Sequence, residues 1–140
     1  MGNKIFVFTD GGSRGNHGQS ACAFVIKNQE GIVLEKRGKK LGVKTNNEAE
    51  YYGVIFALEY FLNNKTILNN INEIVFYVDS KLVVSQLNGL FKVKDQNIRN
   101  FVQDIYLKEN QIGNSIKYNL IPRGKNFEAD KIVNETLDSF

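Results

Sequence analysis

The 140-residue sequence contains one cysteine, one proline, one histidine and no tryptophan. Cys22 has no partner for an internal disulfide, whereas small secreted domains are usually rich in disulfides, so we expect a cytoplasmic protein. A single histidine and a single cysteine also exclude the ligand spacings of zinc sites. No apolar run approaches the roughly 20 residues of a membrane-spanning helix, so we expect no membrane insertion.

The composition is typical of one folded domain. Hydrophobic residues make up 42% of the chain and charged residues 24%. A chain of this size buries roughly two thirds of its unfolded surface, which is enough for a core, so we expect a single domain over residues 1–140. The net charge of +3 permits a polyanionic partner without requiring one. Nothing in the sequence indicates an obligate protein partner, and we expect a monomer.

Short apolar, β-branched and aromatic runs predict five strands. Gly11 and Gly12 follow the first run, and Asn28-Gln29-Glu30-Gly31 has the composition of a hairpin turn, so the first three strands should form an antiparallel meander. The two later strands need crossover connections and should lie parallel to the first. The predicted strands cover residues 4–10, 21–27, 32–37, 74–79 and 116–121.

Apolar positions at helical spacing predict four helices, which interrupt the strands in the order βββαβααβα. This order predicts an α/β fold with a five-stranded mixed sheet, an antiparallel meander plus parallel strands, flanked by helices. The predicted helices run from Thr45 to about Leu62, over residues 82–87, from Asp95 to about Glu109, and from Asn126 to about Leu137.

Two of the buried strands end in aspartate. Ile5-Phe6-Val7-Phe8-Thr9 leads to Asp10, and Ile74-Val75-Phe76-Tyr77-Val78 leads to Asp79. If these strands are parallel neighbours, the two carboxylates lie side by side, and like charges so close repel unless one is protonated or a cation lies between them. Mg²⁺ or Mn²⁺, which prefer oxygen ligands, would meet that need.

Helical acids complete the candidate set. Thr45 and Glu48 have the spacing of a capping box, whereas Glu50 lies on the stripe that faces the sheet. On the last helix Asp130 is in line with Val133 and Leu137. A second interpretation is that Asp130 only favours the positive end of its helix, and the sequence leaves both open.

These motifs resemble type 1 ribonuclease H over essentially the whole chain. The resemblance rests on Thr9-Asp10-Gly11-Gly12-Ser13-Arg14-Gly15-Asn16, Thr45-Asn46-Asn47-Glu48-Ala49-Glu50, Asp79-Ser80 and Asn126-Phe127-Glu128-Ala129-Asp130. It implies a ribonuclease H-like fold and an endonuclease that hydrolyses the RNA strand of RNA/DNA hybrids to 5′-phosphate and 3′-hydroxyl ends. It further implies that Asp10, Glu50, Asp79 and Asp130 are catalytic and hold two Mg²⁺ or Mn²⁺ ions.

The resemblance also implies the substrate contacts, and it has two departures. Leu120 stands where longer family members have a loop histidine, and the stretch before Asp130 is too short for their extra basic helix, so the chain is similar to the short form. Lys92, Lys94, Arg123 and Lys125 are possible substitutes for the missing basic region. The expected substrate-binding residues are Gly11, Gly12, Ser13, Asn16, Asn46, Asn47, Ser80, Arg123 and Asn126.

Other interpretations are weaker. A phosphoacceptor receiver domain should have a helix directly after the first strand, and an exonuclease of the same superfamily should have glutamate where Gly12 stands. A related nuclease for double-stranded RNA or DNA, or a hybrid-binding module without catalysis, stays as an alternative. The basic run over residues 36–40 is interpreted as a solvated loop rather than a phosphate site. Tyr51, Tyr52 and Tyr60 are interpreted as packing rather than base-stacking residues.

Overall fold

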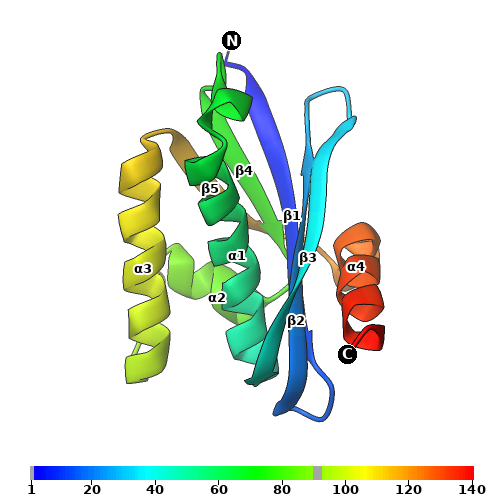
Figure 1. Ribbon diagram of the computed structural model, residues 1–140. Helices are drawn as coiled ribbons and strands as arrows, with labels where there is room; N and C mark the ends of the chain where they lie inside the picture. The colour runs from blue at the N-terminus through cyan, green and yellow to red at the C-terminus, as the bar shows by residue number, and fades with distance from the viewer. Residues whose placement is uncertain (1, 90–92) are drawn as a thin grey trace.

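A five-stranded mixed sheet with the strand order β3-β2-β1-β4-β5 forms the centre of the molecule (Figure 1). The fold is taken from a computed structural model, in which residues 2–89 and 93–140 are described. β2 is antiparallel to β1 and β3, whereas β4 is parallel to β1 and β5, which confirms the predicted fold class. The strands are β1 (Lys4–Ser13), β2 (Gly18–Lys27), β3 (Val33–Lys44), β4 (Glu73–Val78) and β5 (Ser115–Leu120).

Helices cover both faces of the sheet. Figure 1 shows α1, α2 and α3 on one face and α4 on the other. Two short 3₁₀ turns that the sequence did not predict, η1 (Lys65–Leu68) and η2 (Arg123–Lys125), lie in the connections. No helix of the described residues is both long and apolar enough to span a bilayer. The helices are α1 (Asn46–Asn63), α2 (Lys81–Leu87), α3 (Gln96–Ile112) and α4 (Phe127–Asp138).

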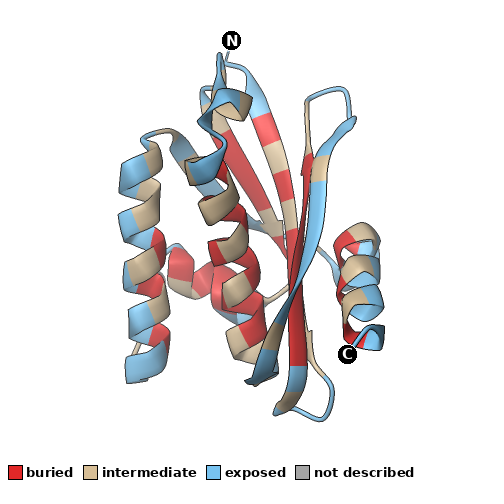
Figure 2. Cartoon of the chain, viewed as in Figure 1, coloured by how far each residue is buried: buried red, intermediate tan, exposed pale blue. Residues whose placement is uncertain are grey.

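The two faces of β2 supply two hydrophobic clusters, because successive side chains of a strand point to opposite sides. Phe24 packs with the α1 residues Val54 and Leu58 in the main core. Ala21 and Ala23, on the other face, pack against α4. Figure 2 shows the resulting buried stripe on the sheet side of each helix.

The prediction that Gly11 and Gly12 end the first strand is wrong. β1 pairs with β2 as far as Ser13, and the turn follows, with Gly15 and Asn16 at φ values of 91° and 23°. Gly11 has a different purpose: a Cβ there would lie 2.0 Å from the carbonyl oxygen of Ala49. The glycine therefore allows α1 to approach β1 closely.

The interpretation of residues 36–40 as a loop is also wrong. β3 continues to Lys44 along β2, with a register shift opposite Ser20/Ala21 and Gly42 at a φ of 78°. The charges are tolerated because β3 is an edge strand that is exposed along most of its length (Figure 2). The basic run is thus part of a regular surface.

Candidate active site

The parallel pairing of β1 and β4 brings the two strand-end aspartates to one edge of the sheet. Thr9 pairs with Val78, so Asp10 and Asp79 are the next residues of neighbouring strands. Asp10 is 7% exposed. This edge is where ligand sites of α/β sheets are usually found.

The start of α1 delivers a third carboxylate to the same place. Thr45 and Glu48 form the predicted capping box: the Thr45 hydroxyl accepts from the Glu48 backbone N–H, and a Glu48 carboxylate oxygen accepts from the Thr45 N–H. Glu48 is therefore occupied at the helix end, as predicted. Glu50, one half-turn further, is 8% exposed and accepts a 3.0 Å hydrogen bond from the Gly11 N–H.

Small residues on both elements make this approach possible. A Cβ on Gly53 would lie 2.8 Å from the carbonyl oxygen of Asp10, and one on Gly11 would strike Ala49. With glycine at both positions, the backbone of α1 lies directly against the end of β1. The position of Glu50 beside Asp10 depends on this close contact.

The three carboxylates suit a divalent cation. Asp10, Glu50 and Asp79 each offer an oxygen within 4.8 Å of the other two. Among the described residues, Glu50 Oε2 and Asp79 Oδ1 are buried oxygens without a hydrogen-bond partner. Buried anionic oxygens that lack partners are costly, and hard cations such as Mg²⁺ bind oxygen ligands of this kind.

The pKa values of the clustered carboxyls also favour a bound cation. Burial, assisted by the charge of Asp79, raises the pKa of Asp10 from 3.8 to about 7. Burial and the neighbouring Asp10 also raise the pKa of Glu50 well above its ordinary value. Without a cation, the cluster therefore retains protons near neutral pH, and a bound cation would displace them.

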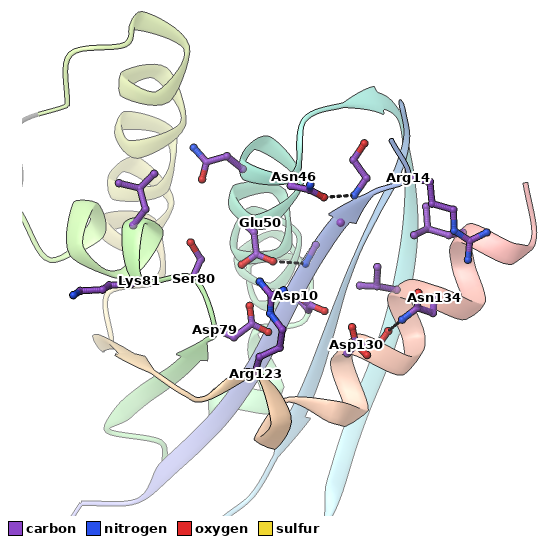
Figure 3. Close-up of a pocket in the computed structure, with 17 residues that line it drawn as sticks. Asp10, Arg14, Asn46, Glu50, Asp79, Ser80, Lys81, Arg123, Asp130 and Asn134 are labelled. Atoms are coloured by element: carbon purple, nitrogen blue, oxygen red, sulfur yellow. Dashed lines mark hydrogen bonds between the residues drawn. The ribbon is translucent and has the colours of Figure 1, made fainter. Parts of the chain in front are cut away.

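Asp130 occupies the other wall of the site. It lies in the first turn of α4, is exposed, and lines the same cavity, but it contributes no oxygen to the 4.8 Å group (Figure 3). Its charge contributes to the raised pKa of Asp10. Its role as a metal ligand therefore stays a prediction, beside the interpretation that it favours the positive helix end.

The acids open into a cavity of about 710 Å³ (Figure 3). The structure brings most of the predicted substrate-binding residues to its wall: Gly11, Gly12, Ser13, Asn46, Asn47, Ser80 and Arg123. Sequence reasoning missed six further lining residues: Arg14, Lys81, Leu82, Val133, Asn134 and Leu137. Lys81 directly follows Asp79-Ser80, and this adjacency was the one available signal for it.

The structure gives Asn126 a role within the protein. Its side chain is buried, with 2% exposed, and its amide donates to Asp79 Oδ2 at 3.0 Å and to the carbonyl oxygen of Thr9 at 2.9 Å. The predicted contact of Asn126 with substrate stays a prediction. Asn126 fixes the orientation of Asp79 against the end of β1.

Asn16 and Ser80, two other predicted substrate contacts, form hydrogen bonds within the protein. Asn16 lies outside the cavity wall, and its Oδ1 accepts a 2.7 Å hydrogen bond from the Asn46 N–H at the start of α1. The Ser80 hydroxyl accepts from the Val83 N–H and caps α2. Both residues shape the rim of the cavity through backbone groups.

The four basic residues that could replace the extra basic helix of longer family members do not lie together. Arg123, on η2, points toward the acids in Figure 3, whereas Lys94 and Lys125 are exposed outside the cavity wall, and Lys92 lies outside the described residues. The connection between α2 and α3 is only eight residues long, residues 88–95. Leu120 is half exposed at the end of β5.

Comparison with known proteins identifies the family. A sequence profile for reverse transcriptase-like domains matches residues 8–136. A ribonuclease HI of Halobacterium salinarum is 32% identical over 98% of this chain and 66% of its own length. A bifunctional protein of Mycobacterium tuberculosis is 32% identical over 97% of this chain. The chain spans about a third of that relative, 36% of its length.

Solved structures agree over the whole fold. The ribonuclease H1 of Halobacterium salinarum has a TM-score of 0.88 at 30% identity, covering 98% of this chain and 99% of its own. A ribonuclease H1 isolated from compost has a TM-score of 0.91 at 36% identity, covering 98% and 97%. The structure of its complex with an RNA/DNA hybrid has a TM-score of 0.90 at 34% identity, covering 96% of this chain and 97% of its own. By profile, sequence and structure together, the chain belongs to the type 1 ribonuclease H family.

Proposed function

We propose that this protein is a metal-dependent endonuclease that hydrolyses the RNA strand of RNA/DNA hybrids and leaves 5′-phosphate and 3′-hydroxyl ends. The observation that carries the proposal is the meeting of Asp10, Glu50 and Asp79 in one open cavity. The solved complex of the compost ribonuclease H1 with a hybrid supports the substrate class. No covalent intermediate with the protein is required.

Asp10, Glu50 and Asp79 would hold Mg²⁺ or Mn²⁺, and Asp130 would complete the ligands of the second of two ions. When bound, such ions activate a water molecule and stabilise the leaving oxygen of a phosphodiester. Hydrogen bonds within the protein hold two of these carboxylates in place without substrate. The Gly11 N–H holds Glu50, and the Asn126 amide holds Asp79.

Polar groups around the acids would read the hybrid. Asn46 and Asn47 lie at the positive end of α1 on the cavity wall, where amide side chains can bind the 2′-hydroxyls that distinguish RNA from DNA. Asn46 Oδ1 already accepts a 2.7 Å hydrogen bond from the Ser13 N–H, which orients it. Arg123 would bind a phosphate through its planar guanidinium.

The test uses the same end-labelled sequence as RNA/DNA hybrid, double-stranded RNA and double-stranded DNA, each incubated with Mg²⁺, Mn²⁺ or EDTA. We expect cleavage of the RNA strand of the hybrid with either metal and none in EDTA. Asp10→Asn and Asp79→Asn should abolish cleavage, whereas the matched control Glu135→Gln, an exposed acid of α4 outside the cavity wall, should not. Cleavage that persists in EDTA, or unchanged turnover by either aspartate variant, would reject the proposal.

A further inference from the structure

A groove lined by cations and aromatic rings runs along α1 and has no part in the site described above. Two sequence motifs meet there that were each interpreted as surface or packing features: the basic run of β3 and the aromatic residues of α1. Tyr52, Phe56 and Tyr60 follow one another at intervals of four residues and so lie along one side of α1. In Figure 1 the end of β3 comes close to the start of this helix.

Each ring carries one cation from β3. Arg37 Cζ lies 4.9 Å from the centre of the Tyr60 ring, Lys39 Nζ lies 5.4 Å from that of Phe56, and Lys44 Nζ lies 5.5 Å from that of Tyr52. All three rings are partly exposed. The result is an ordered row of three cation–ring pairs at the surface.

The row borders two adjoining hollows of about 520 and 250 Å³ between β3, α1 and α3. Glu59 and Asp104 also line them, but Lys108 lies 2.7 Å from Asp104 and 4.0 Å from Glu59. The hollows are thus lined by three cations (Arg37, Lys39 and Lys108) and two acids, a net charge of +1, and Arg37 also lies 3.3 Å from Glu35 of its own strand. The groove combines positive charge with ring faces, as do surfaces that bind single-stranded nucleic acid.

Charge is concentrated on β3 beyond what the composition suggests. The strand contains five basic residues and one acidic residue, an excess of four. The whole chain has a net charge of +3, so the remainder carries a net charge of −1. Three of these five basic residues, Arg37, Lys39 and Lys44, face the rings of α1.

The groove begins at the rim of the catalytic cavity. Lys44 directly precedes Thr45, the cap of α1, and Asn46 lines the cavity. From Lys44 to Arg37 the strand extends roughly 23 Å away from that rim, at about 3.3 Å per residue. A nucleic acid strand that leaves the catalytic cavity at this side would therefore meet the groove.

We propose that this groove binds the single-stranded flank of a nucleic acid whose hybrid part occupies the catalytic cavity; the inference thus rests on the proposed function. Arg37 and Lys39 would contact phosphates, and bases would stack on the exposed parts of the Phe56 and Tyr60 rings. A duplex is too stiff to turn from the cavity down the edge of the sheet, because its persistence length is about 150 base pairs. A single strand can make that turn.

Two measurements test this proposal. The first is the fluorescence anisotropy of a labelled 12-nucleotide oligothymidine, titrated with protein in EDTA. The second is KM for a blunt hybrid and for the same hybrid with a 12-nucleotide single-stranded tail, with tails placed at each end in turn. We expect the wild-type protein to bind the oligonucleotide and to have a lower KM for one tailed hybrid than for the blunt one, with equal kcat.

The double variant Arg37→Gln/Lys39→Gln should weaken oligonucleotide binding about tenfold or more. It should reduce the slope of log K against log salt by about 1.4, because each single-strand phosphate contact accounts for about 0.7. KM for the tailed hybrid should rise to that of the blunt one. The matched control Lys36→Gln/Lys117→Gln makes the same charge change on the other side of β3 and on the opposite edge strand, and should change neither quantity.

The ring contribution is tested with Tyr60→Leu, which should weaken oligonucleotide binding about fivefold, whereas Tyr60→Phe should preserve it. If the pairs only fasten β3 to α1, Tyr60→Leu would lower the melting temperature but leave binding unchanged. That result, or equal KM for blunt and tailed hybrids, would overturn the inference. If the protein cleaves the blunt hybrid but does not bind the oligonucleotide, this inference alone is rejected. If it binds the oligonucleotide but cleaves no hybrid, the proposed function alone is rejected.

Discussion

Replacing Asp10 by asparagine should stabilise the protein at alkaline pH. Asp10 is held nearly out of solvent beside Glu50 and Asp79, and this burial raises its pKa from 3.8 to about 7. A raised carboxyl pKa means that the folded state disfavours the ionised form. Asparagine keeps the shape of the side chain and removes the charge.

The size of the effect follows from the shift in pKa. A difference of roughly three units, at about 1.4 kcal/mol each, corresponds to a penalty on the order of 4 kcal/mol when Asp10 is fully ionised. Between pH 4 and 7 the folded wild-type protein binds more protons than the unfolded chain, so its free energy of unfolding falls as pH rises. The advantage of Asp10→Asn should therefore be near zero at pH 4 and reach its full size above pH 7.

The assay is urea unfolding of wild type and Asp10→Asn in EDTA at several pH values from 4 to 8.5. Glu135→Gln is the control, because it removes an exposed carboxylate of α4 that lies outside the cluster. Saturating Mg²⁺ should narrow the difference, since a ligand that binds the folded wild-type site stabilises it. A difference between Asp10→Asn and wild type that does not vary with pH, or a destabilised variant at pH 8, would refute the reasoning.

Four further outcomes follow from the structure. Glu48→Ala should lower the free energy of unfolding in urea by about 1 kcal/mol through loss of the capping box, and should retain hybrid cleavage. Gly11→Ala should cost about 3 kcal/mol or more by the same measurement and lose cleavage, because its Cβ would strike the Ala49 carbonyl oxygen. Asn126→Ala should reduce kcat more than it raises KM, because Asp79 loses its orienting amide. Calorimetric titration with Mg²⁺ in buffers of different ionisation enthalpy should show that Mg²⁺ binding releases protons below pH 7 and fewer protons above it. The affinity for Mg²⁺ should rise as the pH increases toward 7.

The elements could be predicted from the sequence where local patterns determine them. Apolar, β-branched runs and helical spacing located the five strands and four helices of the described residues. The spacing of Thr45 and Glu48 identified the cap that the structure contains. The parallel pairing of β1 and β4 followed from the need for a crossover connection. Each of these features depends on residues close together in the chain or on a general rule of connectivity.

Features that depend on contact between distant segments were missed. Gly11 was interpreted as the end of a strand because its contact with Ala49 of α1 has no local signature. The extension of β3 depends on its pairing with β2 through a register shift, which residues 36–44 do not reveal by themselves. The hydrogen bonds of Asn126 to Thr9 and Asp79 had no local signature either, because the packing of α4 on the sheet decides them.

The features that bring the acids together are the ones that make them unfavourable for folding. Gly11 and Gly53 let α1 contact β1, which buries Glu50 beside Asp10 and raises the pKa of both carboxyls. A sequence selected for stability alone would have an apolar or amide side chain at Asp10, since the charge costs on the order of 4 kcal/mol. A bound divalent cation would offset that cost, because it stabilises the ionised acids of the folded state only. The unfavourable burial of these acids therefore supports the proposed cation site.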